Sequence, residues 1–468
     1  MKSFRSTFIF ALIVALVVGF ALWDFFSQER QRTEEAQARK VFQVDLERVV
    51  GLRVEREPSP LILERRGDFW FSESPIQDRL EDFAVETLLR SLLEQEALDI
   101  SSQARGGSED QDLRWEDYGL DQPMAQFELT WTSGPGEGEQ EPQILSAALG
   151  TVKAYDGRYY MRRGESLLLV EDAWTGLVET SLNGLREKRA WRQPEVVNQV
   201  EIQHRGQVVA GVRMNPTTGQ WEYTESLGFS VEEDLVESLL QRVRGLRIGS
   251  FVAEDKDPQT LRLYSLERPE WRLALDDWVL ELSSPPGSES EGESKTLFAM
   301  SSSENFVFSL SRAQAEHLKK TNLDLRHRSE PFEFELLNVT EMRLTQGEQS
   351  LQINKLGTDW VVAGAAGEAE DIEVDRKALV AFFERLNLLR ADSFFPRPLR
   401  GSVKAPEDNK IELLDSEGQL VLRLSWGLPF EDVESDRQMV HLHSSQSPEL
   451  MMVTASQLEE LSLEGLLE

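Results

Sequence analysis

The sequence predicts an α+β fold in which an N-terminal transmembrane helix precedes three tandem, similar units with mostly antiparallel sheets. Three short stretches, "GDFWF", "GQWEY" and "TDWVV", each place a tryptophan ahead of an amphipathic helix. Strand-like segments are grouped together rather than alternating one-for-one with helices, and this grouping is typical of α+β domains. The first residues form a long apolar run, which predicts the membrane helix.

Aligning the chain on the three tryptophans, Trp70, Trp221 and Trp360, brings three helical patterns into register. Apolar residues follow at i, i+3, i+4 and i+7, which is one face of a helix. The offsets after the first two tryptophans are identical, and the third set is shifted by four residues that the "AGAAGEAEDI" loop can absorb. The three sets are Val85, Leu88, Leu89 and Leu92; Val236, Leu239, Leu240 and Val243; and Leu379, Phe382, Phe383 and Leu386.

Weaker landmarks set the limits of the units. "YGLDQP" at 118–123 is answered by "YSLERP" at 264–269, each followed by a strand-like run, and the third unit has no such motif. Short closing helices are predicted by capping boxes that begin at Ser311 and Thr454. We therefore expect a first repeat at 41–191, a second at 195–328 and a degenerate third at 331–468, with boundaries near Pro194 and Pro331.

Residues 1–26 are predicted to form an uncleaved transmembrane anchor. No charged residue occurs from Phe8 to Trp23, and with its flanks the run reaches about 20 residues, roughly 30 Å of helix. A cleaved signal peptide is the alternative, but the small-residue cleavage site typical of one is missing after the run. Residues 27–40 mix charges at helical spacing and are interpreted as a stalk.

The charges beside the anchor do not decide its orientation, because basic residues lie on both sides. The short N-terminal tail and the large domain that follows favour a cytoplasmic N-terminus with the repeats in the periplasm, at a bacterial inner membrane. The absence of cysteine fits a periplasmic location without proving it.

Composition excludes one class of partner. The chain has 83 acidic and 50 basic residues, a formal net charge of −33. Such a polyanion repels nucleic acid, so we expect no nucleic-acid partner.

No catalytic, cofactor or metal residues are predicted, and we expect the protein not to be an enzyme. His441 and His443 alternate on a predicted strand and share one face, but spacing suggests no third metal ligand. Acidic pairs such as Glu81-Asp82 occur throughout an acidic chain and do not identify a catalytic dyad. An uncharacterised envelope hydrolase is the least favoured of the functions considered.

Tryptophans are the remaining candidates for ligand contacts. Trp70, Trp221 and Trp360 recur at one position and are interpreted as core residues that pack on the following helix. Those that do not recur are candidate interface or sugar-stacking residues, namely Trp115, Trp131, Trp174, Trp191, Trp271, Trp278 and Trp426.

The order of anchor, Trp70, the leucine-rich helix at 85–93 and the Tyr118-Gly119-Leu120 element with Pro123 resembles a bacterial family known as domain of unknown function 4340. The resemblance extends over 1–190 and less fully over 195–328. It implies an accessory or scaffold role beside the permease and auxiliary subunits of gliding-motility-type ABC transporters. A periplasmic glycan- or ligand-binding module is the alternative.

Overall fold

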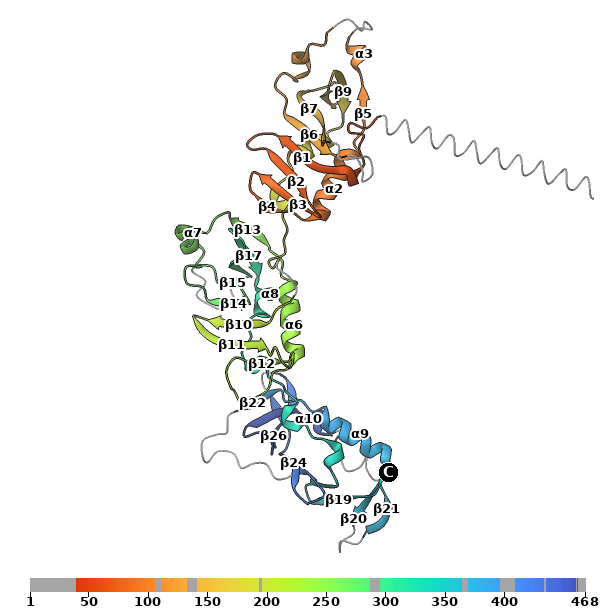
Figure 1. Ribbon diagram of the computed structural model, residues 1–468, viewed down its shortest axis with the longest axis vertical. Helices are drawn as coiled ribbons and strands as arrows, with labels where there is room; N and C mark the ends of the chain where they lie inside the picture. Colours follow the sequence, from red (N-terminus) through yellow and green to blue (C-terminus); the bar gives the residue numbers. More distant parts are fainter. Residues whose placement is uncertain are drawn as a thin grey trace, which may run out of the picture. The chain divides into compact units, whose positions relative to one another are not determined.

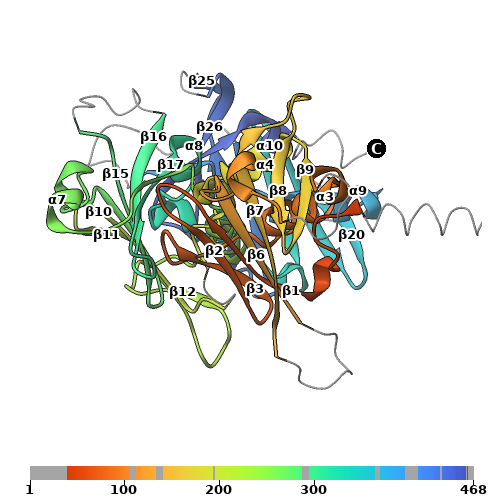
Figure 2. The same cartoon turned by 90° about the horizontal axis from the view of Figure 1, so that it is seen from above.

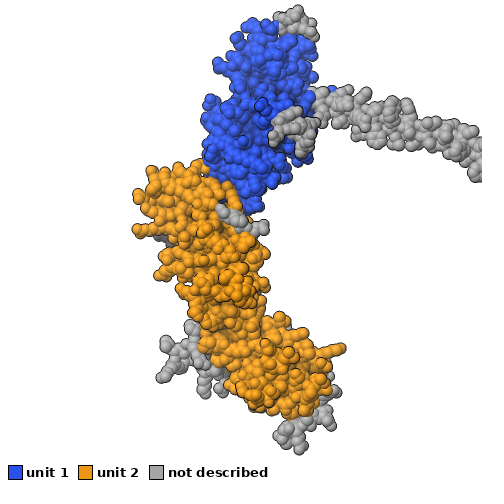
Figure 3. Space-filling view, in the orientation of Figure 1, with its two compact units in different colours: residues 1–189, 247–251 blue, residues 190–246, 252–468 orange. Residues whose placement is uncertain are grey.

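The computed structural model describes residues 39–105, 112–132, 141–192, 196–286, 295–363, 369–395, 409–432, 435–459 and 461 (Figure 1). Two compact units are distinguished in Figure 3: unit 1 contains 1–189 and 247–251, and unit 2 contains 190–246 and 252–468. The predicted anchor at 1–26, and all of the predicted stalk except its last two residues, lie outside the described residues. No helix within the described ranges is long and apolar enough to span a membrane.

The first sheet has nine strands in the order β4-β3-β2-β1-β6-β7-β8-β9-β5, all antiparallel to their neighbours. Figure 2 shows β1, β2, β3 and β6 running side by side. The strands are β1 Val49–Glu55, β2 Leu61–Arg66, β3 Phe69–Ser74, β4 Asp78–Arg79, β5 Ala97–Asp99, β6 Ala125–Trp131, β7 Gln143–Lys153, β8 Tyr159–Arg163 and β9 Ser166–Val170. The helices of this repeat are α2 Asp82–Leu93, α3 Ser101–Ala104, α4 Ala173–Val178 and α5 Leu182–Leu185.

The second sheet has eight strands in the order β12-β11-β10-β14-β15-β16-β17-β13. Its strands are β10 Gln199–His204, β11 Gln207–Met214, β12 Trp221–Tyr223, β13 Ser250–Ala253, β14 Trp271–Leu275, β15 Trp278–Ser283, β16 Thr296–Ser301 and β17 Val307–Ser311. Its helices are α6 Glu233–Arg244, α7 Pro258–Leu263 and α8 Arg312–Glu316.

The third sheet follows the order β21-β20-β19-β18-β23-β24-β26-β27-β22, and β25 pairs with β26 off this path. Its strands are β18 Glu341–Gln346, β19 Gln349–Leu356, β20 Asp359–Ala363, β21 Ala369–Glu373, β22 Ser393–Phe395, β23 Asn409–Leu414, β24 Leu420–Trp426, β25 Phe430–Asp432, β26 Arg437–Ser444 and β27 Leu450–Thr454. Its helices are α9 Arg376–Asn387 and α10 Ala455–Glu459.

The three sheets share one strand order, which agrees with the predicted repetition. In each, the strand that follows the long helix lies at one edge (β5, β13 and β22), and the first strand of the repeat lies beside a later strand (β6, β14 and β23). The predicted mostly antiparallel sheets are confirmed.

The predicted helical faces are also confirmed. All four predicted apolar residues are buried in α6 and in α9, and in α2 only Leu88 is partly exposed. Trp70 is buried in the core of unit 1, and Trp360 packs on Phe383 of α9 with ring centroids 5.7 Å apart. Trp221 is half-buried. Ser311 is the N-cap of α8, since its hydroxyl accepts from the Gln314 backbone N–H at 3.3 Å.

The Tyr-x-Leu-x-x-Pro element has the same structure in the first two repeats. Tyr118 packs edge-to-face on Tyr160 of β8 at 4.9 Å, and Tyr264 packs in the same way on Phe298 of β16 at 4.7 Å. The residue after each tyrosine adopts a left-handed conformation, with φ of 64° at Gly119 and 60° at Ser265. The element therefore makes the same bend in both repeats where it crosses the later strands of its sheet.

A buried arginine closes the second repeat. Arg326 is 3 % exposed, its guanidinium carbon lies 3.6 Å from the centroid of the Phe394 ring in β22, and it forms an ion pair with Glu449. The backbone beside it pairs with the segment ahead of α6, since Glu232 N–H donates to Leu325 at 2.9 Å and His327 N–H donates to the Ser230 carbonyl at 3.0 Å. Within unit 2, this arginine therefore joins the second sheet to the third.

Arg186 has the same environment within unit 1. It is fully buried, its Nε donates to Asp78 at 2.6 Å, and its guanidinium carbon lies 3.6 Å from the centroid of the Phe251 ring. Glu81 N–H donates to the Leu185 carbonyl at 2.8 Å, which matches the bond from Glu232 to Leu325. We call this arrangement, at Arg186 and at Arg326, the arginine joint.

We predict that Arg326→Ala destabilises the protein by about 2–4 kcal/mol, because it removes a stacked guanidinium and leaves Glu449 without its partner. Arg326→Lys keeps the charge but not the planar stack, so an intermediate loss is expected. Arg213→Ala is the matched control: Arg213 is 58 % exposed and pairs with Glu222, so its loss changes stability by less than about 0.5 kcal/mol. Urea unfolding followed by circular dichroism measures all three, and equal effects at 326 and 213 would contradict the joint.

Candidate functional site

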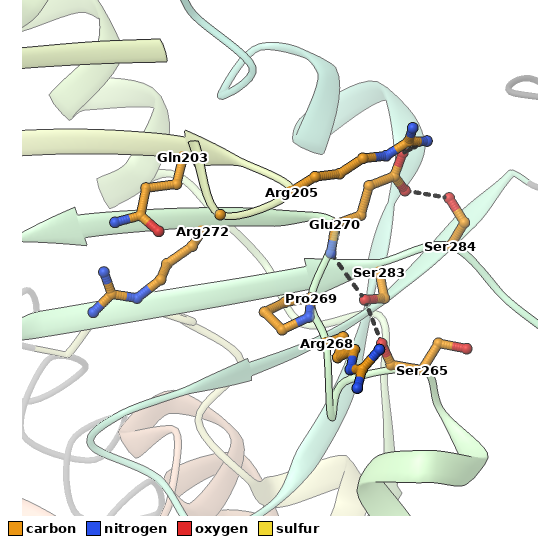
Figure 4. A pocket seen from close by; sticks show the side chains of 10 residues that line it. Gln203, Arg205, Ser265, Arg268, Pro269, Glu270, Arg272, Ser283 and Ser284 are labelled. Carbon is orange, nitrogen blue, oxygen red and sulfur yellow. Dashed lines mark hydrogen bonds and ion pairs between the residues drawn. The ribbon is translucent and has the colours of Figure 1, made fainter. Parts of the chain in front are cut away.

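A cleft with a volume of about 610 Å³ lies on the second repeat (Figure 4). Its walls come from the β10–β11 turn, the "YSLERP" element and the end of β15. The lining residues are Gln203, Arg205, Gly206, Ser265, Arg268, Pro269, Glu270, Arg272, Ser283 and Ser284. The volume is within the range of small-molecule sites.

The floor of the cleft is fixed by Ser283. Its hydroxyl donates to the Ser265 carbonyl at 2.7 Å and accepts from the Glu270 backbone N–H at 3.3 Å. Figure 4 shows this serine between the two segments. The bonds hold the "YSLERP" element against β15, so the cleft is formed before any ligand arrives.

The charged lining is mainly basic. Arg205 lies 3.9 Å from the Glu270 carboxylate, and the Ser284 hydroxyl donates to the same carboxylate at 2.9 Å. Arg272 lies 3.8 Å from both Glu201 and Glu281 on the neighbouring strands. Figure 4 shows Arg205, Glu270 and Ser284 gathered on one side of the cleft, with Arg272 and Gln203 on another.

Burial perturbs two groups beside the cleft. Burial raises the pKa of the Glu281 carboxyl, although Arg272 and Lys256 act in the opposite direction. Burial also lowers the pKa of Lys256, whose Nζ donates to the Ser301 carbonyl at 2.9 Å. Both groups carry their charge at a cost in desolvation, which their mutual attraction offsets only in part.

The first repeat has a smaller cleft of about 300 Å³ at the matching element. Leu120, Asp121 and Pro123 line it, together with residues of β6 to β8 and a single arginine, Arg162. A third cleft, of about 420 Å³, lies at the start of α6 and is lined by Trp221 and His327 with Glu232, Glu233 and Asp234.

The non-repeating tryptophans do not line these three clefts. Trp174, Trp191, Trp278 and Trp426 are buried, and the other three are half-buried. Trp271 lies on the β14 face opposite Arg272 and stacks on His204, with ring centroids 4.3 Å apart. Trp221, which the sequence assigned to the core, lines the cleft at the start of α6.

The structure places His441 and His443 on the same face of β26, as predicted, with Leu442 buried between them. His441 stacks on Phe430 with ring centroids 4.5 Å apart. Within the described ranges, no group of three or more His, Asp or Glu side chains is arranged to hold a metal ion.

Sequence reasoning missed the arginines of the cleft and of the joint. A signal for the joint was present, because Leu185-Arg186-Glu187-Lys188 and Leu325-Arg326-His327-Arg328 share a Leu-Arg-x-basic pattern at the ends of the first two repeats. The cleft arginines carry no such pattern: Arg268 and Arg272 lie four residues apart, and Arg205 comes from the β10–β11 turn far from them in the chain.

We predict that Gly119→Ala is far more damaging than Gly67→Ala. Both glycines have φ near 60°, but a Cβ at Gly119 would lie 2.4 Å from Thr151 Oγ1 and 2.9 Å from the Val152 backbone N, whereas a Cβ at Gly67 meets nothing within 4 Å. The unfolding free energy should fall by about 1 kcal/mol for Gly67→Ala and by more than about 2 kcal/mol for Gly119→Ala. Similar losses, measured by urea unfolding, would show that the element is not held against β7.

Glu281→Gln should stabilise the protein at neutral pH. Because the pKa of Glu281 is raised in the folded state, the folded protein holds the proton of this carboxyl more tightly than the unfolded chain does. The stabilisation from this proton is fully present below the unfolded pKa of about 4.3 and is lost as the pH rises through the folded pKa. The variant's advantage in urea unfolding should therefore appear at pH 7 and vanish near pH 4. Glu222→Gln, at a side chain that is 39 % exposed, is the control. An advantage that persists at pH 4 would contradict the assignment.

Comparison with known proteins gives one match. The family model described as "Domain of unknown function (DUF4340)" matches residues 221–415. No curated protein and no solved structure matches the chain. The match confirms the family resemblance, but it lies over the second repeat and the start of the third, whereas the residues that suggested the family lie mainly in the first.

The matched segment begins at β12 and ends just after β23, so it does not follow the limits of the sheets. It includes α6, α9, Arg326 and Phe394, and with them most of the joint in unit 2. The DUF4340 family model therefore matches residues 221–415 of this chain, which is less than half of its length.

Proposed function

We propose that this protein is a non-enzymatic, membrane-anchored accessory or scaffold protein of an ABC-type export or envelope complex, with its repeats in the periplasm. The observation that carries the proposal is the arginine joint, which recurs at Arg186 and Arg326 with the same stacking distance of 3.6 Å. A joint of this kind fixes neighbouring elements without forming a reaction centre. Tandem repeats held in this way typically act by presenting surface to partners.

The second and third sheets supply the clearest case. Besides Arg326, the ion pair between Arg390 and Glu232 and the hydrogen bond from Ala391 N–H to the Arg328 carbonyl at 3.0 Å join them within unit 2. Two domains fixed by charge pairs and backbone bonds can transmit a force or hold a partner at a set position, as a scaffold requires.

The anchor belongs to the same proposal. The apolar run at 1–26 would hold the protein in the inner membrane beside permease helices, and residues 27–40 would separate the repeats from the bilayer. The acidic surface suits partners with basic faces.

Affinity purification from detergent-solubilised membranes of the native host tests this proposal. We expect permease or auxiliary subunits of an ABC-type transporter to be recovered with the tagged full-length chain, and to be lost with a variant that lacks residues 1–26. Repeated recovery of the tagged protein alone, under conditions that keep a known membrane complex intact, would contradict the accessory role.

A periplasmic ligand-binding module is the second candidate. It is favoured by the preformed cleft of the second repeat, whose floor is held by Ser283. Glycan-array binding by the full-length protein in detergent tests the glycan form of this candidate, and no binding to any saccharide would remove that form.

A further inference from the structure

The cleft of the second repeat concentrates positive charge on an acidic protein. Three arginines, Arg205, Arg268 and Arg272, line it with a single glutamate, while the whole chain carries a formal net charge of −33. A basic concave site on a polyanion attracts anions locally even though the long-range field repels them, because salt screens charges beyond about 8–10 Å.

The three arginines differ in how strongly they are already engaged. Arg272 lies between Glu201 and Glu281, each 3.8 Å away. Arg205 lies 3.9 Å from Glu270, which is beyond hydrogen-bonding distance. Arg268 is exposed and has no ion-pair or hydrogen-bond partner in the described part of the chain. Arg268 and Arg205 can therefore offer guanidinium N–H groups to an incoming ligand.

Two residues that line the cleft have a left-handed backbone conformation. Arg205 and Ser265 have φ values of 50° and 60°, in the left-handed region that non-glycine residues rarely adopt. The first repeat has Gly119 at the position of Ser265. Arg205 and Ser265 both line the cleft, whereas Asp276, which also has a positive φ of 48°, lies in the β14–β15 turn outside it.

The first repeat shows what the same scaffold looks like without this feature. Its cleft has about half the volume and is lined by one arginine with two acidic residues, Asp121 and Glu128. Gln126, the second residue of β6, occupies the place that Arg272 takes in β14. Of these two matching clefts, only the one in the second repeat is therefore mainly basic.

We propose that the cleft of the second repeat binds a small molecule through a carboxylate or phosphate group. The planar guanidinium fork matches either oxyanion. Arg268 and Arg205 bind the oxyanion, and Glu270, which already accepts from the Ser284 hydroxyl, is the competing carboxylate that the ligand displaces from Arg205. The site is separate from the scaffold role, which depends on the joint and the anchor.

Isothermal titration of the full-length protein in detergent with citrate and, separately, with pyrophosphate tests the site. We expect saturable 1:1 binding of at least one probe, weakened by added salt, and the stronger probe identifies the oxyanion class. Arg268→Gln should weaken binding at least about fivefold, since a charged hydrogen bond is lost. Glu270→Gln should strengthen it about two- to fivefold, because the competing charge is removed.

Arg213→Gln is the matched control, since it removes the same charge from an exposed residue of β11 outside the cleft. It should leave the dissociation constant unchanged within about a factor of 1.5. No saturable binding of either probe would overturn the site, and so would equal losses for Arg268→Gln and Arg213→Gln. Neither result bears on co-purification with a transporter, so this inference and the scaffold proposal fail separately.

Discussion

The buried arginine at the end of each of the first two repeats is the interaction on which the rest of the structure depends. A guanidinium that is 0–3 % exposed is costly to bury, and it is tolerated here because a carboxylate and an aromatic face replace its water. Its backbone pairs at the same time with the segment ahead of the long helix. Each arginine thus holds the end of its own repeat against the start of that repeat's long helix. It also packs on an aromatic residue of the edge strand in the next repeat, Phe251 for Arg186 and Phe394 for Arg326.

The joint leaves the clefts free to differ. Both Tyr-x-Leu-x-x-Pro elements are held by the same aromatic contact, which does not involve the charged residues that line the clefts. The cleft of the first repeat is smaller and lined mainly by acidic charges, and that of the second is larger and lined mainly by basic ones. A shared frame with variable linings is how one fold supports different ligands.

Much of the frame was predictable because it depends on local periodicity. The i, i+3, i+4, i+7 pattern located α2, α6 and α9, and nearly every residue that it named is buried. The cleft was not predictable, because Arg205 becomes a neighbour of Arg268 and Arg272 only when β10 pairs with β14, and no sequence spacing encodes that pairing. The interpretation of Trp221 as core was only partly right, since β12 is an edge strand with one side open.

Native-state hydrogen exchange on the full-length protein tests most directly whether the joint makes the second and third sheets one cooperative body. The account predicts that amides in β10 and β23, and the Ala391 amide that bonds to Arg328, exchange through one opening with a common free energy. Two distinct free energies for the two sheets, with fast exchange at Ala391, would contradict it.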